Sequence, residues 1–422
     1  MVKHLAHVHT RTISVAAIVI WLTAAGYMLF FAARWQLDLQ VYRGAGHLLY
    51  AGGNPFDTRF TAARLPFTYP PFALMILSPF SFGSIGVVAT IWWLLSAAAL
   101  VTTLYLFLEA ERHGTARVRA EHDETVARWR SFAIAAALGG IACLALEPLR
   151  SNIDYGQVNF GLMLLVAFDA TRPESRWRGT LIGVAAAVRL TPIVYLAIFA
   201  FRRDWRSLLR GVGTFSAATL VGWVVLPSES SLYWFHEAGN SGRTGGVTSR
   251  SNQSWYGLLN RQPFHGSFWG WAVLGALTVG CGLFVAKRSS ARGRISETIM
   301  ALALTELLVS PVSWSHHWSW VAIAPIVVVS LWKRHRMVAW ALIVILAIAA
   351  LEPYWWFYPR GVVTDLLCDS LGLCGAGALV VWTYAELRMQ VPQLPHRPKV
   401  ALSKQGSPSL TGVVTDSSNS YP

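Results

Sequence analysis

Two aspartates follow the first long apolar run of the sequence and could act as general bases. Asp38 stands in the string DLQVY and Asp57 in GNPFD, both within the polar stretch of residues 34–70. A carboxylate in such a loop can take a proton from a hydroxyl group. An aspartate at this kind of position can also cap a short helix. The residues alone leave both interpretations open.

Two adjacent histidines form a second candidate group. His316 and His317 lie between Trp314 and Trp318, in a turn that joins two apolar runs. Imidazole can donate to a phosphate, exchange a proton or bind a metal. Neither H-x-x-x-H nor H-E-x-x-H spacing accompanies the pair. We therefore predict no metal site and no required cofactor.

Arg189 lies midway along the apolar segment of residues 180–201. A charge inside such a segment indicates a functional site by default. The alternatives are a side chain that extends to the membrane surface, or an ion pair with an acid such as Glu306.

The string EPLRSNIDYGQVNF places polar residues just before another apolar run. Gln157 and Asn159 enter that run, so we expect both to face a polar cavity, because unpartnered polar groups at membrane depth are costly. We predict that they bind the phosphate or the sugar of a donor there. Asp154 precedes the run, and we expect hydrogen bonds within the loop to satisfy it.

A glycine- and serine-rich stretch, SGRTGGVTSRSNQSWYGLLNR, carries a further polar set. Backbone amides and arginines in such a loop suit phosphate or sugar hydroxyls. The default for this composition is a flexible solvated loop. The candidate binding residues are Arg243, Arg250, Asn252 and Gln253.

The composition indicates that membrane-spanning helices position these residues. The chain has 422 residues, of which 54% are hydrophobic and only 13% charged, and its mean hydropathy is +0.44. A bilayer core of about 30 Å needs about 20 apolar residues in a helix. We predict an all-α integral membrane bundle of about ten to twelve spans. The ten clearest are residues 12–33, 84–109, 131–147, 158–171, 208–227, 267–286, 295–312, 318–331, 337–351 and 366–387.

The basic residues set the predicted orientation. The net charge of +14 could suggest nucleic acid, but the basic residues flank apolar runs, which favours a membrane protein with no nucleic-acid partner. Lys and Arg stay preferentially on the cytoplasmic side. A cytoplasmic N-terminus places all five lysines inside. We therefore expect both termini in the cytoplasm and the candidate site on the outer face.

Two apolar segments do not fit a simple series of spans that each cross the membrane once. Residues 180–201 have basic clusters on both sides, so we predict a broken hairpin that enters from the cytoplasmic side and returns, with its break at RLTP. Residues 66–80 have the same character on the outer side. Residues 1–387 are expected to form a single domain, followed by a disordered cytoplasmic tail at 388–422.

The ordered series of motifs resembles glycosyltransferase family 87, a branch of the GT-C superfamily. The series covers residues 36–320 and is most similar to actinobacterial polyprenol-phosphate-mannose-dependent α-1,2-mannosyltransferases. Its members here are DLQVYRGAG, GNPFD, FTYPPFA, GQVN, AAVRLTP, NQS and SPVSWSHHW.

The resemblance implies a GT-C fold, a polyprenyl-phosphate mannose donor, a glycolipid acceptor such as a mannosylated phosphatidylinositol or lipomannan, and a site on the outer face of the plasma membrane. It implies an acidic catalytic base in the first outer loop, which maps to Asp38 with Asp57 as the competitor. His316 or His317 would assist the acceptor hydroxyl or the departing phosphate, and Arg189 would bind the donor phosphate.

Two rival functions stay open on the sequence. An arabinofuranosyltransferase that uses a polyprenyl-phosphate donor would employ the same site. A transporter of lipid-linked sugars would also contain broken helices and an intramembrane arginine, but it predicts polar residues along a whole path and an internal repeat.

Overall fold

The computed structural model describes residues 2–30, 35–115, 124–240, 242, 246–261 and 266–389. Arg243 and nearly all of the predicted tail lie outside these residues. The predicted domain boundary at residue 388 therefore stays a prediction.

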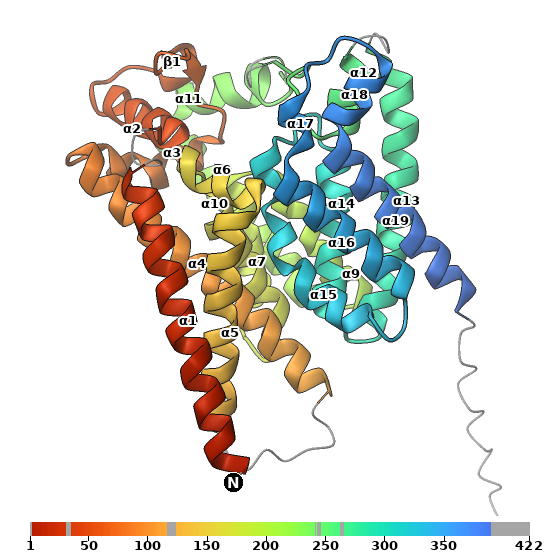
Figure 1. The fold of residues 1–422 in the computed structure, drawn as a ribbon. Coiled ribbons are helices and arrows are strands. Elements are labelled where there is room, and N and C mark those ends of the chain that lie inside the picture. Colours follow the sequence, from red (N-terminus) through yellow and green to blue (C-terminus); the bar gives the residue numbers. More distant parts are fainter. Residues whose placement is uncertain are drawn as a thin grey trace, which may run out of the picture. The chain divides into compact units, whose positions relative to one another are not determined.

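The described chain is helical almost throughout, as predicted (Figure 1). The longer helices run roughly alongside one another. They are α1 (Val2–Phe30), α4 (Ile85–Thr115), α5 (Glu124–Ala145), α10 (Trp205–Val225), α13 (Phe268–Ala291), α16 (Arg336–Leu351) and α19 (Ser370–Arg388). Shorter helical pieces pack between them: α7 (Asn159–Thr171), α8 (Thr180–Val188), η4 (Thr191–Leu196), α9 (Ala197–Phe201), α14 (Ile295–Val309), η7 (Ser315–Ile323) and α15 (Ala324–Leu331).

Short elements gather at one end of this bundle, the upper end in Figure 1. We call this end the loop end. Its elements are α2 (Leu37–Tyr50), η2 (Pro55–Asp57), β1 (Arg59–Phe60), β2 (Leu65–Pro66), α3 (Pro71–Leu77), η3 (Ser78–Ser81), α6 (Glu147–Tyr155), α11 (Pro227–Leu232), η5 (Tyr233–Glu237), α12 (Trp255–Asn260), α17 (Pro353–Trp356) and α18 (Val362–Cys368). The two strands pair antiparallel, with Phe60 opposite Leu65.

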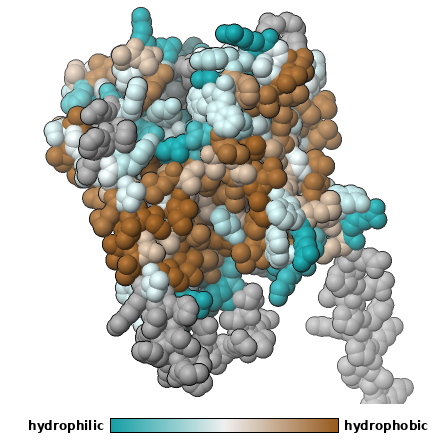
Figure 2. All heavy atoms as spheres, viewed as in Figure 1, coloured by the Kyte–Doolittle hydropathy of each residue, from teal (hydrophilic) through white to brown (hydrophobic). Residues whose placement is uncertain are grey.

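Six helices in the described part of the chain are long and apolar enough to cross a membrane: α4, α5, α10, α13, α19 and the stretch from α16 into α17. Apolar residues gather in a broad band between more hydrophilic ends (Figure 2). This is the surface of a multi-pass membrane protein. The other predicted spans fall on α1, α7, α14 and η7 with α15, whose apolar stretches are shorter, so the predicted total of ten to twelve stays a prediction.

Residues 180–201 form the broken hairpin that their flanking charges predict. Helix α8 stops at Val188, Arg189 is extended at φ −149° and ψ 131°, and η4 begins at Thr191. The two ends of the hairpin lie close together, since an ion pair of 3.2 Å joins Arg178 Nη1 to Asp204 Oδ2. Helix α8 has nine residues, and it therefore rises only about 14 Å. The break thus lies inside the bundle.

Residues 66–80 also do not form a membrane-spanning helix. They form α3 and η3, of seven and four residues. A helix of seven residues is only about 10 Å long, so this segment contributes to the loop end.

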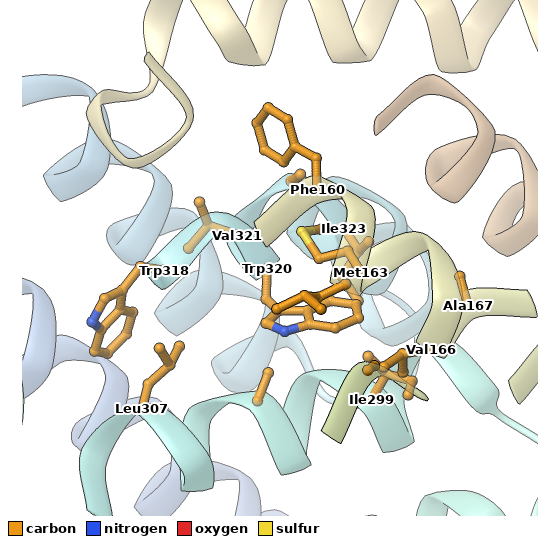
Figure 3. Packing of buried hydrophobic residues seen from close by; sticks show 14 of the residues in the cluster. Phe160, Met163, Val166, Ala167, Ile299, Leu307, Trp318, Trp320, Val321 and Ile323 are labelled. Carbon is orange, nitrogen blue, oxygen red and sulfur yellow. The ribbon is translucent and has the colours of Figure 1, made fainter. Parts of the chain in front are cut away.

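Helix α14 is the centre of the core. Thirteen of its 15 residues are buried. Apolar side chains of α7 pack against α14 and η7, with Val166 beside Ile299 and Met163 beside Trp320 (Figure 3). Lipid tails are as apolar as these side chains, so close packing, rather than removal from water, stabilises such contacts.

Buried ion pairs join helices at the end opposite to the loop end. Glu297 is fully buried and accepts from Arg334 Nη2 at 2.5 Å. Glu386 is also fully buried and accepts from Arg292 Nη1 at 2.7 Å. These pairs connect the turns around α14, α15 and α19.

The hairpin packs on α10 through glycine, which gives a stability prediction. A Cβ on Gly183 would lie 2.4 Å from the Gly211 carbonyl oxygen, whereas a Cβ on Gly213 would meet nothing within 4 Å. Gly183→Ala should therefore destabilise the protein by about 1–3 kcal/mol through overpacking. Gly213→Ala is the matched control and should be neutral or slightly stabilising. Thermal unfolding in detergent measures both, and equal midpoints would contradict this packing.

Candidate functional site

A cavity of about 370 Å³ lies among the elements of the loop end. Its walls come from α2, the segment before α3, the end of α6, the break of the hairpin, residues 249–251 and the start of η7. Five residues predicted from the sequence line it together: Asp38, Gln157, Arg189, His316 and His317. Segments more than 270 residues apart in the chain thus meet in one place.

Asp38 lies in the first turn of α2 and is half-buried at the cavity wall. Its Oδ2 accepts a hydrogen bond of 2.7 Å from Gln157 Nε2. Burial raises the pKa of Asp38 to about 6, although the bond from Gln157 and the positive charge of Arg189 act in the opposite direction. A carboxylate with a pKa near neutrality is suited to accept a proton.

Asp57 has different surroundings. It ends η2, its side chain is exposed, and it does not line the cavity. The start of η2 is capped by Asn54, whose side chain accepts from the Phe56 amide at 3.0 Å. Of the two aspartates that compete on the sequence, only Asp38 therefore lies at the cavity.

Arg189 presents its guanidinium group at the cavity, although it belongs to a hairpin that enters from the opposite side. Its Nη1 donates to Asn159 Oδ1 at 2.6 Å, and its Nη2 lies 2.8 and 2.9 Å from the two ring nitrogens of His317. It forms no ion pair with any residue that the structure describes. Glu306, the acid considered as its partner, accepts instead from Tyr195 at 2.9 Å.

These neutral partners satisfy donors of Arg189 without forming an ion pair with it. An enclosed positive charge favours an anionic ligand, and guanidinium groups suit phosphate oxygens in particular. The site therefore places an anion-binding group and a proton acceptor on the walls of one cavity.

The two histidines have different surroundings. His317 contacts Arg189, and its Nδ1 also accepts from the Trp314 amide at 3.2 Å. His316 stacks edge-on against Tyr155, with ring centroids 5.2 Å apart, and its buried Nε2 has no hydrogen-bond partner in the described part of the protein. The His316 ring thus lines the cavity with a buried nitrogen that has no partner among the described residues, whereas His317 orients Arg189.

Glu147 supports the turn that holds the histidines. This buried carboxylate accepts from Ser315 at 2.9 Å, from Tyr354 at 2.6 Å and from Trp355 at 3.1 Å. It thereby ties α6 to η7 and α17. Asp154, at the other end of α6, accepts from Tyr27 on α1, so its partner comes from another helix and not from its own loop.

The structure places three of the predicted binding residues away from the cavity. Arg250 donates to the Trp355 and Phe357 carbonyls. Asn252 bonds to the backbone of Val247, Pro311 and Ser313, and Gln253 bonds to the backbone of Arg250, Cys368 and Gly372. These polar side chains hold the loop against its neighbours and do not line the cavity, so their predicted role in ligand binding stays a prediction. Ser249 and Ser251 of the same loop line the cavity instead.

Sequence reasoning missed several cavity residues. Tyr69 and Tyr155 line the wall beside Asp38. Tyr69 stands in the FTYPPFA motif, but nothing in the motif by itself distinguishes it from a membrane-interface aromatic residue. Asn159 was expected at a polar cavity, and it reaches the cavity region through its bond to Arg189.

The sequence matches the model of glycosyltransferase family 87 over residues 67–311. A relative from Mycolicibacterium smegmatis is named polyprenol-phosphate-mannose-dependent alpha-(1-2)-phosphatidylinositol mannoside mannosyltransferase. It is 35% identical over 340 residues, which cover 76% of this chain and 75% of the relative.

A relative from Mycobacterium tuberculosis with the same name is 34% identical over 347 residues, or 77% of this chain and 78% of the relative. A third, from another strain of that species, is named as a pentamannoside mannosyltransferase and is 32% identical over 290 residues, covering 68% of this chain and 64% of the relative. The match to the family model and the extent of these similarities show that the chain belongs to glycosyltransferase family 87.

Proposed function

We propose that this glycosyltransferase moves mannose from polyprenyl-phosphate mannose to a mannosylated phosphatidylinositol or lipomannan acceptor and forms an α-1,2 linkage. The observation that carries the proposal is the shared cavity, whose walls hold both the Asp38 carboxylate and the Arg189 guanidinium group. A sugar phosphodiester needs both groups, one for the acceptor hydroxyl and one for the phosphate. The names of the similar mannosyltransferases support mannose as the sugar.

The proposed reaction is a single displacement with inversion. Asp38 takes the proton of an acceptor mannose hydroxyl, whose oxygen attacks the anomeric carbon of β-mannosyl phosphate. The bond between that carbon and the phosphate oxygen breaks, and polyprenyl phosphate leaves. Arg189, held by Asn159 and His317, stabilises the charge that grows on the phosphate, which is usually the largest electrostatic contribution to such catalysis. His316 Nε2 contacts the acceptor hydroxyl or the phosphate.

The orientation follows from the distribution of charge. Basic residues concentrate at the end opposite to the loop end, as in Arg292, Arg334 and Arg178, and such an end is cytoplasmic by the positive-inside rule. The cavity then opens on the extracytoplasmic side of the plasma membrane, with both termini in the cytoplasm. Soluble nucleotide sugars stay in the cytoplasm, so a donor carried across on a lipid fits this location.

The catalytic base gives a direct prediction. Asp38→Asn should lower the rate of mannose transfer by about 10²-fold or more, because the amide cannot accept the proton. Asp57→Asn should stay near wild type, because Asp57 is exposed and outside the cavity. The measurement is transfer of labelled mannose from polyprenyl-phosphate mannose to mannosylated phosphatidylinositol by purified protein. An active Asp38→Asn enzyme, or an inactive Asp57→Asn enzyme, would move the base to Asp57.

The phosphate site predicts an effect on donor binding. Arg189→Gln should raise KM for the donor and lower kcat, because the phosphate loses its charged partner both when bound and when leaving. Arg250→Gln removes an equal charge from the same end of the protein. It should reduce thermal stability without changing KM for the donor, because Arg250 holds the α17 region. Equal donor KM values for these two variants would refute the assignment of Arg189.

The ligand set of the cavity predicts metal-independent transfer. Among the residues that line it, Asp38 is the one carboxylate, and no group of three His, Cys, Asp or Glu in the described chain could hold an ion. Mg²⁺ and Mn²⁺ prefer several oxygen ligands, so Arg189 supplies the positive charge instead. Transfer should persist in excess EDTA. A loss that added Mg²⁺ or Mn²⁺ restores would overturn this part of the proposal.

A further inference from the structure

The side chain of Gln157 bridges Asp38 and a pair of tyrosines. Its Nε2 donates to Asp38 Oδ2 at 2.7 Å, and its Oε1 accepts from Tyr69 at 2.9 Å. Tyr42 lies 3.1 Å from the Tyr69 oxygen and 3.4 Å from Gln157 Oε1. All four groups thus form one connected hydrogen-bond chain from the interior to the cavity.

The tyrosines fix which way the amide of Gln157 points. Each tyrosine hydroxyl has one proton to give. Tyr69 gives its proton to the amide oxygen, and Tyr42 lies within reach of both the Tyr69 oxygen and the amide oxygen. If the amide turned over, its oxygen would face the Asp38 carboxylate, and two acceptors would lie at hydrogen-bond distance without a proton between them. The turned orientation suits only a protonated Asp38. The observed orientation therefore favours the ionised carboxylate.

We propose that Gln157, oriented by Tyr69, is a positioning residue that keeps Asp38 ionised and directed into the cavity. This rests on the proposed function of Asp38 as the base, and it replaces the expectation that Gln157 binds donor phosphate or sugar. The amide oxygen and one amide hydrogen are already engaged within the protein. Gln157 is 5% exposed and Tyr69 9%, so water competes little for these bonds.

Other charged or titratable groups lie around Asp38, and of these Arg189 acts on its pKa in the same direction as Gln157. They are Tyr42 on the same helix, Tyr69 before α3, Tyr155 at the end of α6, Arg189 in the hairpin, and His316 and His317 on η7. Burial raises the pKa of Asp38 to about 6, and Gln157 and Arg189 lower it from what burial alone would give. Wild-type transfer should accordingly fall as the pH drops below about 6, where the carboxyl becomes protonated and cannot act as a base.

The pH dependence of kcat/KM tests the inference. Gln157→Leu removes the donor to the carboxylate at similar volume, and the acid limb of the profile should move to higher pH by about one to two units. Tyr69→Phe keeps the amide but frees it to turn, so the acid limb should move in the same direction by less. Tyr155→Phe is the matched control. It removes a hydroxyl from the same cavity without touching the amide, and its acid limb should stay at the wild-type position.

Two kinetic outcomes would overturn the inference. One is an acid limb that stays in place in both Gln157→Leu and Tyr69→Phe. The other is a change confined to KM for donor or acceptor, which would mean that Gln157 binds the ligand directly. Tyr69→Phe removes a single oxygen atom, so it serves as the test if Gln157→Leu does not fold.

A spectroscopic titration separates this inference from the proposed function. The infrared carbonyl band of protonated Asp38, assigned by its loss in Asp38→Asn, should titrate at higher pH in Gln157→Leu than in wild type. An unmoved midpoint contradicts the role of Gln157 whatever the activity. If the midpoint differs between Gln157→Leu and wild type but the wild-type protein transfers no mannose, the proposed function is refuted and the positioning role of Gln157 stands.

Discussion

A guanidinium group inside a membrane bundle must be solvated by the protein, and much of this structure serves that need. Arg189 lies where α8 stops, and its contacts come from Asn159 at the start of α7 and from His317 on η7. All of these are neutral, so they satisfy the donors of the guanidinium without cancelling its charge. The turn that carries His317 is itself held by the buried Glu147. The site thus depends on a broken hairpin whose tip is held by hydrogen bonds from Arg189 to neutral side chains.

Most of the fold could be predicted because span length and flanking charge are strong signals. Within the described residues, each of the ten predicted spans is mostly helical, and the hairpin breaks at RLTP as predicted. The contacts that place η7 could not be predicted, since Glu147 and Ser315 are 168 residues apart. The number of helices that cross the bilayer is also hard to predict from the sequence, because α7 and α14 are shorter than the bilayer core.

The sequence singles out candidate site residues by their positions relative to the apolar runs. Asp38 follows one, Arg189 interrupts one, and His316 and His317 join two, and all four line one cavity. The polar loop around Asn252 was harder to interpret, because amide side chains bond equally well to a ligand and to free backbone groups. The backbone groups of Pro311 and Ser313, to which Asn252 bonds, are about 60 residues further along the chain, so the sequence does not reveal these bonds. Tyr69 was overlooked for the opposite reason, since aromatic residues are common at membrane interfaces.

The cavity contains one carboxylate and one guanidinium group, and this pairing has a consequence for turnover. In the proposed reaction the donor is a phosphodiester with one negative charge, and the product polyprenyl phosphate carries up to two. The proton taken by Asp38 offsets the difference, so the total charge in the cavity is the same before and after transfer. What changes is its location, because one negative charge passes from Asp38 to the phosphate beside Arg189. The extra negative charge beside Arg189 therefore holds the product more tightly than the donor. We expect the release of polyprenyl phosphate to be slow for this reason.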